Sequence, residues 1–207
     1  MVDLSTKYLT GRVNKIVLIL AILTIIYTSS LFVAPLTLES GTVEELDGAA
    51  NRVVYREEWD ELHMYHRAIY YFGDFNCHQK HYRSYSLGGN QMPVCSRDVG
   101  IFVGASIGLL LMSFARGAKD YKDILIENMN LDPTMSDDKK VVILLIIGAI
   151  LALPLILDGS IQMVTDYESF NEFRTFTGLL FGFGFSVFVS SLLLSLPIVE
   201  RYDETHQ

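Results

Sequence analysis

The side chains most able to do chemistry lie in one stretch, residues 75–104, which reads FNCHQKHYRSYSLGGNQMPVCSRDVGIFVG. It contains both cysteines of the protein, Cys77 and Cys95, and two of its five histidines, His78 and His81. Thiolate and imidazole groups are the ligand types that suit zinc, and either group can also act as a nucleophile or a general base. We therefore take this stretch as the centre of a candidate site.

Charged side chains elsewhere in the chain could complete that site. Arg83, Arg97 and Arg174 can each bind a phosphate or carboxylate through two parallel hydrogen bonds. Asp158 and Gln162 are four residues apart, so they share one helix face near the end of an apolar segment. An aspartate at membrane depth costs roughly 2.5–3.5 kcal/mol and needs a partner, and the sequence suggests Arg174 for that role.

The elements that must position these residues are apolar helices. The chain has 207 residues, of which 50% are hydrophobic, and four runs are long enough to cross a bilayer core, which takes roughly 20 helical residues. We predict an all-α fold of one integral membrane domain, residues 1–207, built as a four-transmembrane-helix bundle. An outer loop, residues 39–98, carries an amphipathic helix and the Cys/His stretch between spans one and two. The predicted spans are residues 16–38, 99–115, 141–162 and 176–199.

Four spans place the suspected groups on one side of the membrane. The Cys/His stretch lies in the first inter-span loop, Asp158 lies at the exit of span three, and Arg174 lies at the entry of span four. Because successive spans alternate in direction, these three regions share one membrane face whichever way the protein is oriented. The sequence therefore predicts a single polar site at one end of the bundle.

The charge pattern suggests orientation and partners. Lys7, Arg12 and Lys15 precede the first span, which favours a cytoplasmic N-terminus, and four spans then place both termini in the cytoplasm of a multi-pass plasma-membrane protein. The net charge of -8 argues against a nucleic-acid partner. The expected partners are membrane lipids and a small-molecule or lipid ligand.

Local patterns add four expectations. Residues 53–72 read as one amphipathic helix, and residues 87–90 read as a turn that lets the two cysteines approach each other. Pro154 should kink the third span. Gly100, Gly104 and Gly108 lie on one face of the second span, where they would let another helix pack closely.

Several motifs together resemble a known family. The runs CHQKHYRS, MPVCSRDVGIFVG, LDGSIQ and ESFNEFRTFTG are similar to those of an uncharacterised, largely archaeal family of membrane proteins, domain-of-unknown-function 2085, over roughly residues 70–195. Asp98 departs from the cysteine or small residue expected there, which weakens a metal site. The resemblance implies a fold, and the family has no established activity. The matching positions are Cys77, His78, Gln79, Arg83, Ser84, Cys95, Arg97, Gly100, Gly104, Asp158, Gly159, Gln162, Asn171, Arg174 and Gly178.

The first functional hypothesis is a membrane-embedded enzyme, metal-assisted, that acts on a lipid or lipid-linked substrate at the outer face. The expected catalytic residues are Cys77, His78, Arg83, Cys95, Arg97, Asp158, Gln162, Asn171 and Arg174. The expected metal ligands, with zinc as the best-suited ion, are Cys77, His78, His81 and Cys95. The alternatives are metal binding or sensing without catalysis, a single disulfide that closes the loop, thiol redox chemistry, and transport.

Overall fold

The computed structural model describes residues 13–116 and 120–195, and these residues are mostly helical, as the sequence predicts. Seven α-helices, one 3-10 turn and one two-stranded hairpin occur within these two ranges. The helices are α1 (Lys15–Thr37), α2 (Arg56–Glu61), α3 (Met64–Asn76), α4 (Ser96–Met112), α5 (Tyr121–Asn128), α6 (Asp137–Val164) and α7 (Asn171–Leu194), and the smaller elements are η1 (His81–Arg83), β1 (Ser86–Leu87) and β2 (Asn90–Gln91).

Three described helices, α1, α6 and α7, are long and apolar enough to cross a membrane. They correspond to predicted spans one, three and four, although the last part of span four lies outside the described residues. The predicted second span forms α4, whose 17 residues extend only about 25 Å, less than the hydrocarbon core of a bilayer. Four complete spans therefore stay a prediction.

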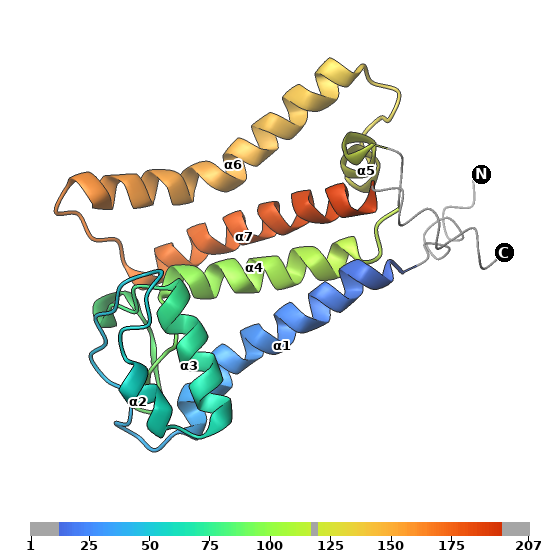
Figure 1. Ribbon diagram of the computed structural model, residues 1–207. Coiled ribbons are helices and arrows are strands. Elements are labelled where there is room, and N and C mark those ends of the chain that lie inside the picture. Colours follow the sequence, from blue (N-terminus) through green and yellow to red (C-terminus); the bar gives the residue numbers. More distant parts are fainter. Residues whose placement is uncertain (1–12, 117–119, 196–207) are drawn as a thin grey trace.

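Glycines bring α4 and α7 into backbone contact along their length. A Cβ atom on Gly100 or Gly104 would collide with the backbone of α7, and one on Gly178 or Gly182 would collide with the backbone of α4. The close approach predicted for the α4 glycines is confirmed. Figure 1 shows α4 between α1 and α7, and a hydrogen bond of 3.0 Å between the hydroxyls of Thr28 and Ser106 joins α1 to α4.

Helix α6 touches α7 where Leu151 packs against Gly184, and charged side chains attach it near both ends. Its only buried residues are Lys140 and Asp158, near opposite ends of the helix. Lys140 forms an ion pair with Asp123 of α5 at 2.5 Å, and Asp158 pairs with Arg97 of α4. Figure 1 shows α6 bent in its middle part, where Pro154 lies inside the helix, as expected for a residue that removes a backbone hydrogen bond.

Residues 39–95 form a cap over one end of α1 and α4 (Figure 1). The single amphipathic helix predicted for residues 53–72 is wrong, because the chain turns out of helical geometry at Leu62 and forms α2 and α3 instead. The Arg67 side chain donates hydrogen bonds to the carbonyl oxygens of Trp59, Asp60 and Leu62, at the end of α2 where the regular helical hydrogen bonds stop. Arg67 therefore stabilises the break.

The predicted turn at residues 87–90 forms the hairpin β1–β2, in which Leu87 pairs with Asn90. Gly88 and Gly89 both have positive φ angles, 62° and 80°, which glycine adopts without strain. The hairpin reverses the chain between the two cysteines and returns residue 95 to the end of α3. This reversal, expected from the sequence, is what allows Cys77 and Cys95 to meet.

Candidate functional site

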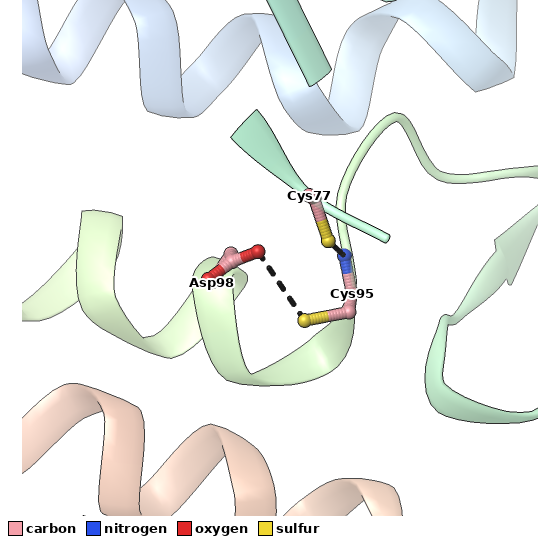
Figure 2. A group of neighbouring side chains, drawn as sticks. All are labelled: Cys77, Cys95 and Asp98. Carbon is pink, nitrogen blue, oxygen red and sulfur yellow. Dashed lines mark hydrogen bonds between the residues drawn. The ribbon is translucent and has the colours of Figure 1, made fainter. Parts of the chain in front are cut away.

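Two cysteines and an aspartate meet where the cap joins α4. Cys77 ends α3, Cys95 is the N-cap residue of α4, and Asp98 lies in the first turn of α4. Their ligand atoms all lie within 4.8 Å of one another, and the Cys95 thiol donates a hydrogen bond to Asp98 Oδ2 at 3.3 Å (Figure 2). Within residues 13–116 and 120–195, this trio is the one group of three or more His, Cys, Asp or Glu side chains close enough to share a metal ion.

The surroundings of the Cys77 sulfur act in two opposite directions. The backbone N–H groups of Cys95 and Gln79 donate hydrogen bonds to it, at 3.2 Å and 3.5 Å, which favours a thiolate. The neighbouring Cys95 side chain, burial of the thiol and the Asp98 carboxylate raise the pKa of Cys77 above its ordinary value. The raised pKa favours the neutral thiol of Cys77, and a cation bound beside the sulfur would lower this pKa and favour the thiolate.

The position of the trio at a helix N-terminus also favours anions. Helix α4 begins directly after Cys95, and its first N–H groups carry partial positive charge at that end. Cys77 is buried, whereas Cys95 and Asp98 are partly exposed. The trio can therefore hold a thiolate pair and a carboxylate beside a position that a further ligand can reach.

The structure does not bring the two predicted histidine ligands into this group. His78 and His81 are both exposed and lie outside the set of side chains able to share an ion. Cys77 has an extended backbone, with φ -129° and ψ 151°, so its side chain and that of His78 project to opposite sides. The structure therefore brings Cys77 and Cys95 together with Asp98 and without the two histidines, and the metal-ligand roles of all these residues stay predictions.

Asp98 was not among the predicted metal ligands, because its presence in place of cysteine counted against a metal site. A signal for it was present, since Cys95 and Asp98 are three residues apart at the start of a helix and such residues are neighbours on its surface. A carboxylate is also an ordinary zinc ligand.

A second polar cluster, formed by ion pairs, ties the ends of α4, α6 and α7 together. Asp158, whose side chain is 1% exposed, pairs with Arg97. Glu168, in the loop between α6 and α7, pairs with both Arg83 and Arg174, and the Arg174 side chain is 2% exposed. The predicted ion pair between Asp158 and Arg174 is wrong. The loop between α6 and α7 places Glu168 against Arg174, and Asp158 pairs with Arg97 instead.

Gln162 and Asn171 join these ion pairs into one network. Arg174 donates to Gln162 Oε1 at 2.9 Å, and Gln162 Nε2 donates to the backbone oxygen of Asp158 at 3.1 Å. Asn171 Oδ1 accepts hydrogen bonds from Arg174 and from the hydroxyl of Ser96, the residue that follows Cys95. The polar groups from three chain regions therefore do meet at one end of the bundle, although their catalytic roles stay predictions.

Replacing Glu168 with glutamine tests the charge network through pH. Burial opposes ionisation of Glu168, but hydrogen bonds and charge from Arg83 and Arg174 hold its pKa below the ordinary value of 4.5. A carboxyl with a depressed folded pKa stabilises the fold above its unfolded pKa and loses that contribution as the pH falls through its folded pKa. We expect the wild-type Tm in detergent to fall more steeply below about pH 4.5 than that of Glu168→Gln, which should already be lower at neutral pH. Parallel curves for the two proteins would show that Glu168 contributes no charge-dependent stability.

The helices and the thiol–carboxylate trio define a multi-pass α-helical membrane protein with a polar cluster at one end. Comparison with known sequences then identifies the family: residues 77–188 match the one described as "Predicted membrane protein (DUF2085)", and the chain belongs to it. The match includes the trio and the whole ion-pair network, and it confirms the resemblance seen in the motifs.

Two archaeal relatives, both described as uncharacterized, are similar to about half of this chain. The protein MJ1492 of Methanocaldococcus jannaschii is 35% identical over 107 residues, which are 52% of this chain and 56% of that protein. A protein of Methanothermobacter thermautotrophicus is 31% identical over 116 residues, which are 56% of this chain and 86% of its own length. The alignment thus covers little more than half of the Methanocaldococcus protein. No solved structure matches the chain significantly.

Proposed function

We propose that the protein is a four-pass membrane protein that binds a thiophilic divalent cation, with zinc as the best-suited ion, through Cys77, Cys95 and Asp98. The observation that carries this proposal is the convergence of three ligand atoms within 4.8 Å at the start of α4. In tetrahedral zinc sites with Zn–S bonds of 2.3 Å, two sulfur ligands stand about 3.7 Å apart. Small side-chain rotations are therefore enough to close the trio around an ion.

Three protein ligands leave one position of a tetrahedral zinc ion to water or a small ligand. Cys95 and Asp98 are partly exposed, which gives that position access from outside the fold. The backbone N–H groups that donate to Cys77 supply the outer hydrogen bonds that orient a metal-binding thiolate. The ligand types and their setting both favour zinc over a hard cation such as magnesium.

In this proposal α4 is the remaining span, the cap lies outside, and both termini are cytoplasmic in the plasma membrane. Helix α4 is flanked by α1 and α7 (Figure 1), so the protein itself, rather than lipid, surrounds much of it. Because protein surrounds much of α4, the length of this helix does not have to match the full thickness of the bilayer. The basic residues before the first span support the orientation, although residues 1–12 and 196–207 lie outside the described ranges.

The arrangement favours metal binding over an enzyme that acts on a lipid. The enzyme hypothesis needs guanidinium groups free to clamp a phosphate, but Arg83, Arg97 and Arg174 each form an ion pair with a carboxylate. Arg174 is also almost fully buried. These residues are better placed to hold α4, α6 and α7 together than to bind a substrate.

A disulfide between Cys77 and Cys95 is the second candidate, since the two sulfurs are close and both cysteines are free. A disulfide would close an 18-residue separation and stabilise the cap by about 3 kcal/mol. It would also remove both thiolates from metal binding, so the two candidates exclude each other in one molecule.

Elemental analysis of the purified full-length protein separates these candidates. We expect one zinc per chain in the wild type, loss of the metal in Cys95→Ser and Asp98→Asn, and retention in the control His78→Ala. After chelation and unfolding in denaturant under non-reducing conditions, which exposes the buried Cys77, both thiols should react with a maleimide. Absence of stoichiometric metal from a wild type whose thiols do not react would instead establish the disulfide, and loss of zinc from His78→Ala would contradict the ligand set.

A further inference from the structure

A second cluster of polar atoms lies in the cap around Gly48 and is made of oxygen atoms only. Asp74 Oδ1, Gln79 Oε1 and the backbone oxygen of His78 surround the space where Gly48 has no side chain. A Cβ atom on Gly48 would lie 3.4 Å, 3.6 Å and 3.3 Å from these three oxygens, respectively. We call this arrangement the Gly48 cradle.

The side-chain oxygens of the cradle lack hydrogen-bond partners among the described residues. Asp74 and Gln79 are both 0% exposed, and neither Asp74 Oδ1 nor Gln79 Oε1 receives a hydrogen bond there. A buried acceptor without a donor is unfavourable by about 1–3 kcal/mol and calls for an explanation. Two such acceptors around one point indicate a missing ligand that both can share.

The orientation of the Asp74 side chain is fixed by its other oxygen. Asp74 Oδ2 accepts hydrogen bonds from the backbone N–H groups of Val54 and Tyr55 and from the Trp59 indole, at 2.8 Å, 2.9 Å and 2.9 Å. These three donors hold the carboxylate in place, so Oδ1 is left facing the Gly48 cradle.

Gln79 is equally constrained. Its Nε2 donates to the backbone oxygen of Pro93 at 2.7 Å, and because that oxygen can only accept, the amide oxygen must point the other way. Gln79 also has a positive φ angle of 46°, which a non-glycine residue rarely adopts. A strained backbone of this kind is kept where the surrounding structure requires it.

The buried carboxylate of Asp74 indicates that a ligand shared by these oxygens carries positive charge. Asp74 is a fully buried carboxylate, and no described lysine, arginine or histidine forms an ion pair with it. The following lysine, Lys80, pairs with Asp47 instead, at 3.2 Å. A buried charge is normally paired or bound to a metal ion, and carboxylate, amide and carbonyl oxygens are the ligands of hard cations.

We propose that the Gly48 cradle binds a small hard cation, sodium, magnesium or calcium, that fastens the irregular segment before α2 to the end of α3. The site differs in chemistry from the sulfur trio, because thiolates select soft ions and oxygen atoms select hard ones. It involves Gly48 and Asp74, which lie outside the region matched by the family. It therefore stands independently of the proposed zinc centre.

The test uses thermal unfolding of the full-length protein in detergent, treated with a chelator and kept in choline chloride. Calcium, magnesium or sodium chloride is added in separate arms, with choline chloride matched for ionic strength. We expect one of these cations to raise the Tm by about 5 °C at saturation, to an equal extent in the wild type and in Cys95→Ser. A response lost in Cys95→Ser would assign the cation to the trio and overturn the proposal.

Two variants act on the cradle without removing its supports. Gly48→Ala places a methyl group 3.3–3.6 Å from the three oxygens, a contact that is slightly tight at the His78 oxygen, and should abolish the cation response while the protein still folds. Asp74→Asn can place an amide donor near Gln79 Oε1, which should make the Tm independent of cations. The proposal is overturned if no cation changes the wild-type Tm, which would leave a buried water as the shared ligand, or if Gly48→Ala responds as the wild type does.

Discussion

Replacing Asp158 with asparagine is expected to lower the free energy of unfolding by about 3–5 kcal/mol. The carboxylate is almost fully buried and is the partner of Arg97, so its loss leaves a guanidinium without a counter-charge at the end of α4. The effect should be large because α6 buries only one other residue, Lys140. In lipid, helices gain little free energy from burying apolar surface against each other. Polar contacts such as the Arg97–Asp158 pair therefore contribute much of the free energy that holds α6 against its neighbours.

The matched control is Asp47→Asn, which makes the same chemical change in an ion pair with Lys80. Asp47 is 67% exposed, and an exposed pair contributes about 0–1 kcal/mol. Denaturant or thermal unfolding of both variants in the same detergent gives the comparison. Equal losses of stability would show that the Arg97–Asp158 pair does not hold α6 in place.

Replacing Gly104 with leucine is expected to prevent α4 and α7 from packing, with a loss of at least about 3 kcal/mol. Even a Cβ atom at this position would meet the backbone of α7 at Leu179, and backbone atoms cannot move aside as a flexible side chain can. The helices would have to separate over several turns, which would also disturb Arg97 and Arg174 at their ends. Size-exclusion chromatography and Tm measurement would detect the change.

Gly148→Leu provides the control on α6. No atom lies within 4 Å of a Cβ placed at Gly148, so the larger side chain extends into open space. Leucine is also the better helix former, by several tenths of a kcal/mol. If Gly104→Leu were as stable as Gly148→Leu, the α4–α7 contact would be loose enough to admit a side chain.

The long helices could be predicted from the sequence because their signal is simple. Apolar runs near the length of a membrane crossing predicted α1, α6 and α7 to within about five residues of their described bounds. The spacing of the glycines predicted which face of α4 packs closely against another helix, and that helix is α7. Both features follow from composition along one segment. The family motifs also marked the correct region, since residues 77–188 match the family.

The pairing of side chains could not be predicted because it depends on short irregular segments. Arg174 pairs with Glu168 because the loop after α6 folds back on α7, and the sequence contains no rule for that loop. His78 points away from Cys77 because the chain is extended there, although residues this close together look like one cluster in the sequence. The burial of Asp74 could not be predicted from the sequence, because it depends on how the cap folds around this residue.

The ligand set of the proposed metal centre can be measured directly by X-ray absorption at the zinc edge of the zinc-loaded, full-length protein. We expect two sulfur neighbours at about 2.3 Å and lighter oxygen neighbours at about 2.0–2.2 Å, without the multiple-scattering pattern of an imidazole ring. Asp98→Asn, prepared in the same way, should hold no stoichiometric zinc and therefore give no comparable zinc edge. A first shell with histidine nitrogen or with no sulfur would contradict the assignment of Cys77, Cys95 and Asp98 as the metal ligands.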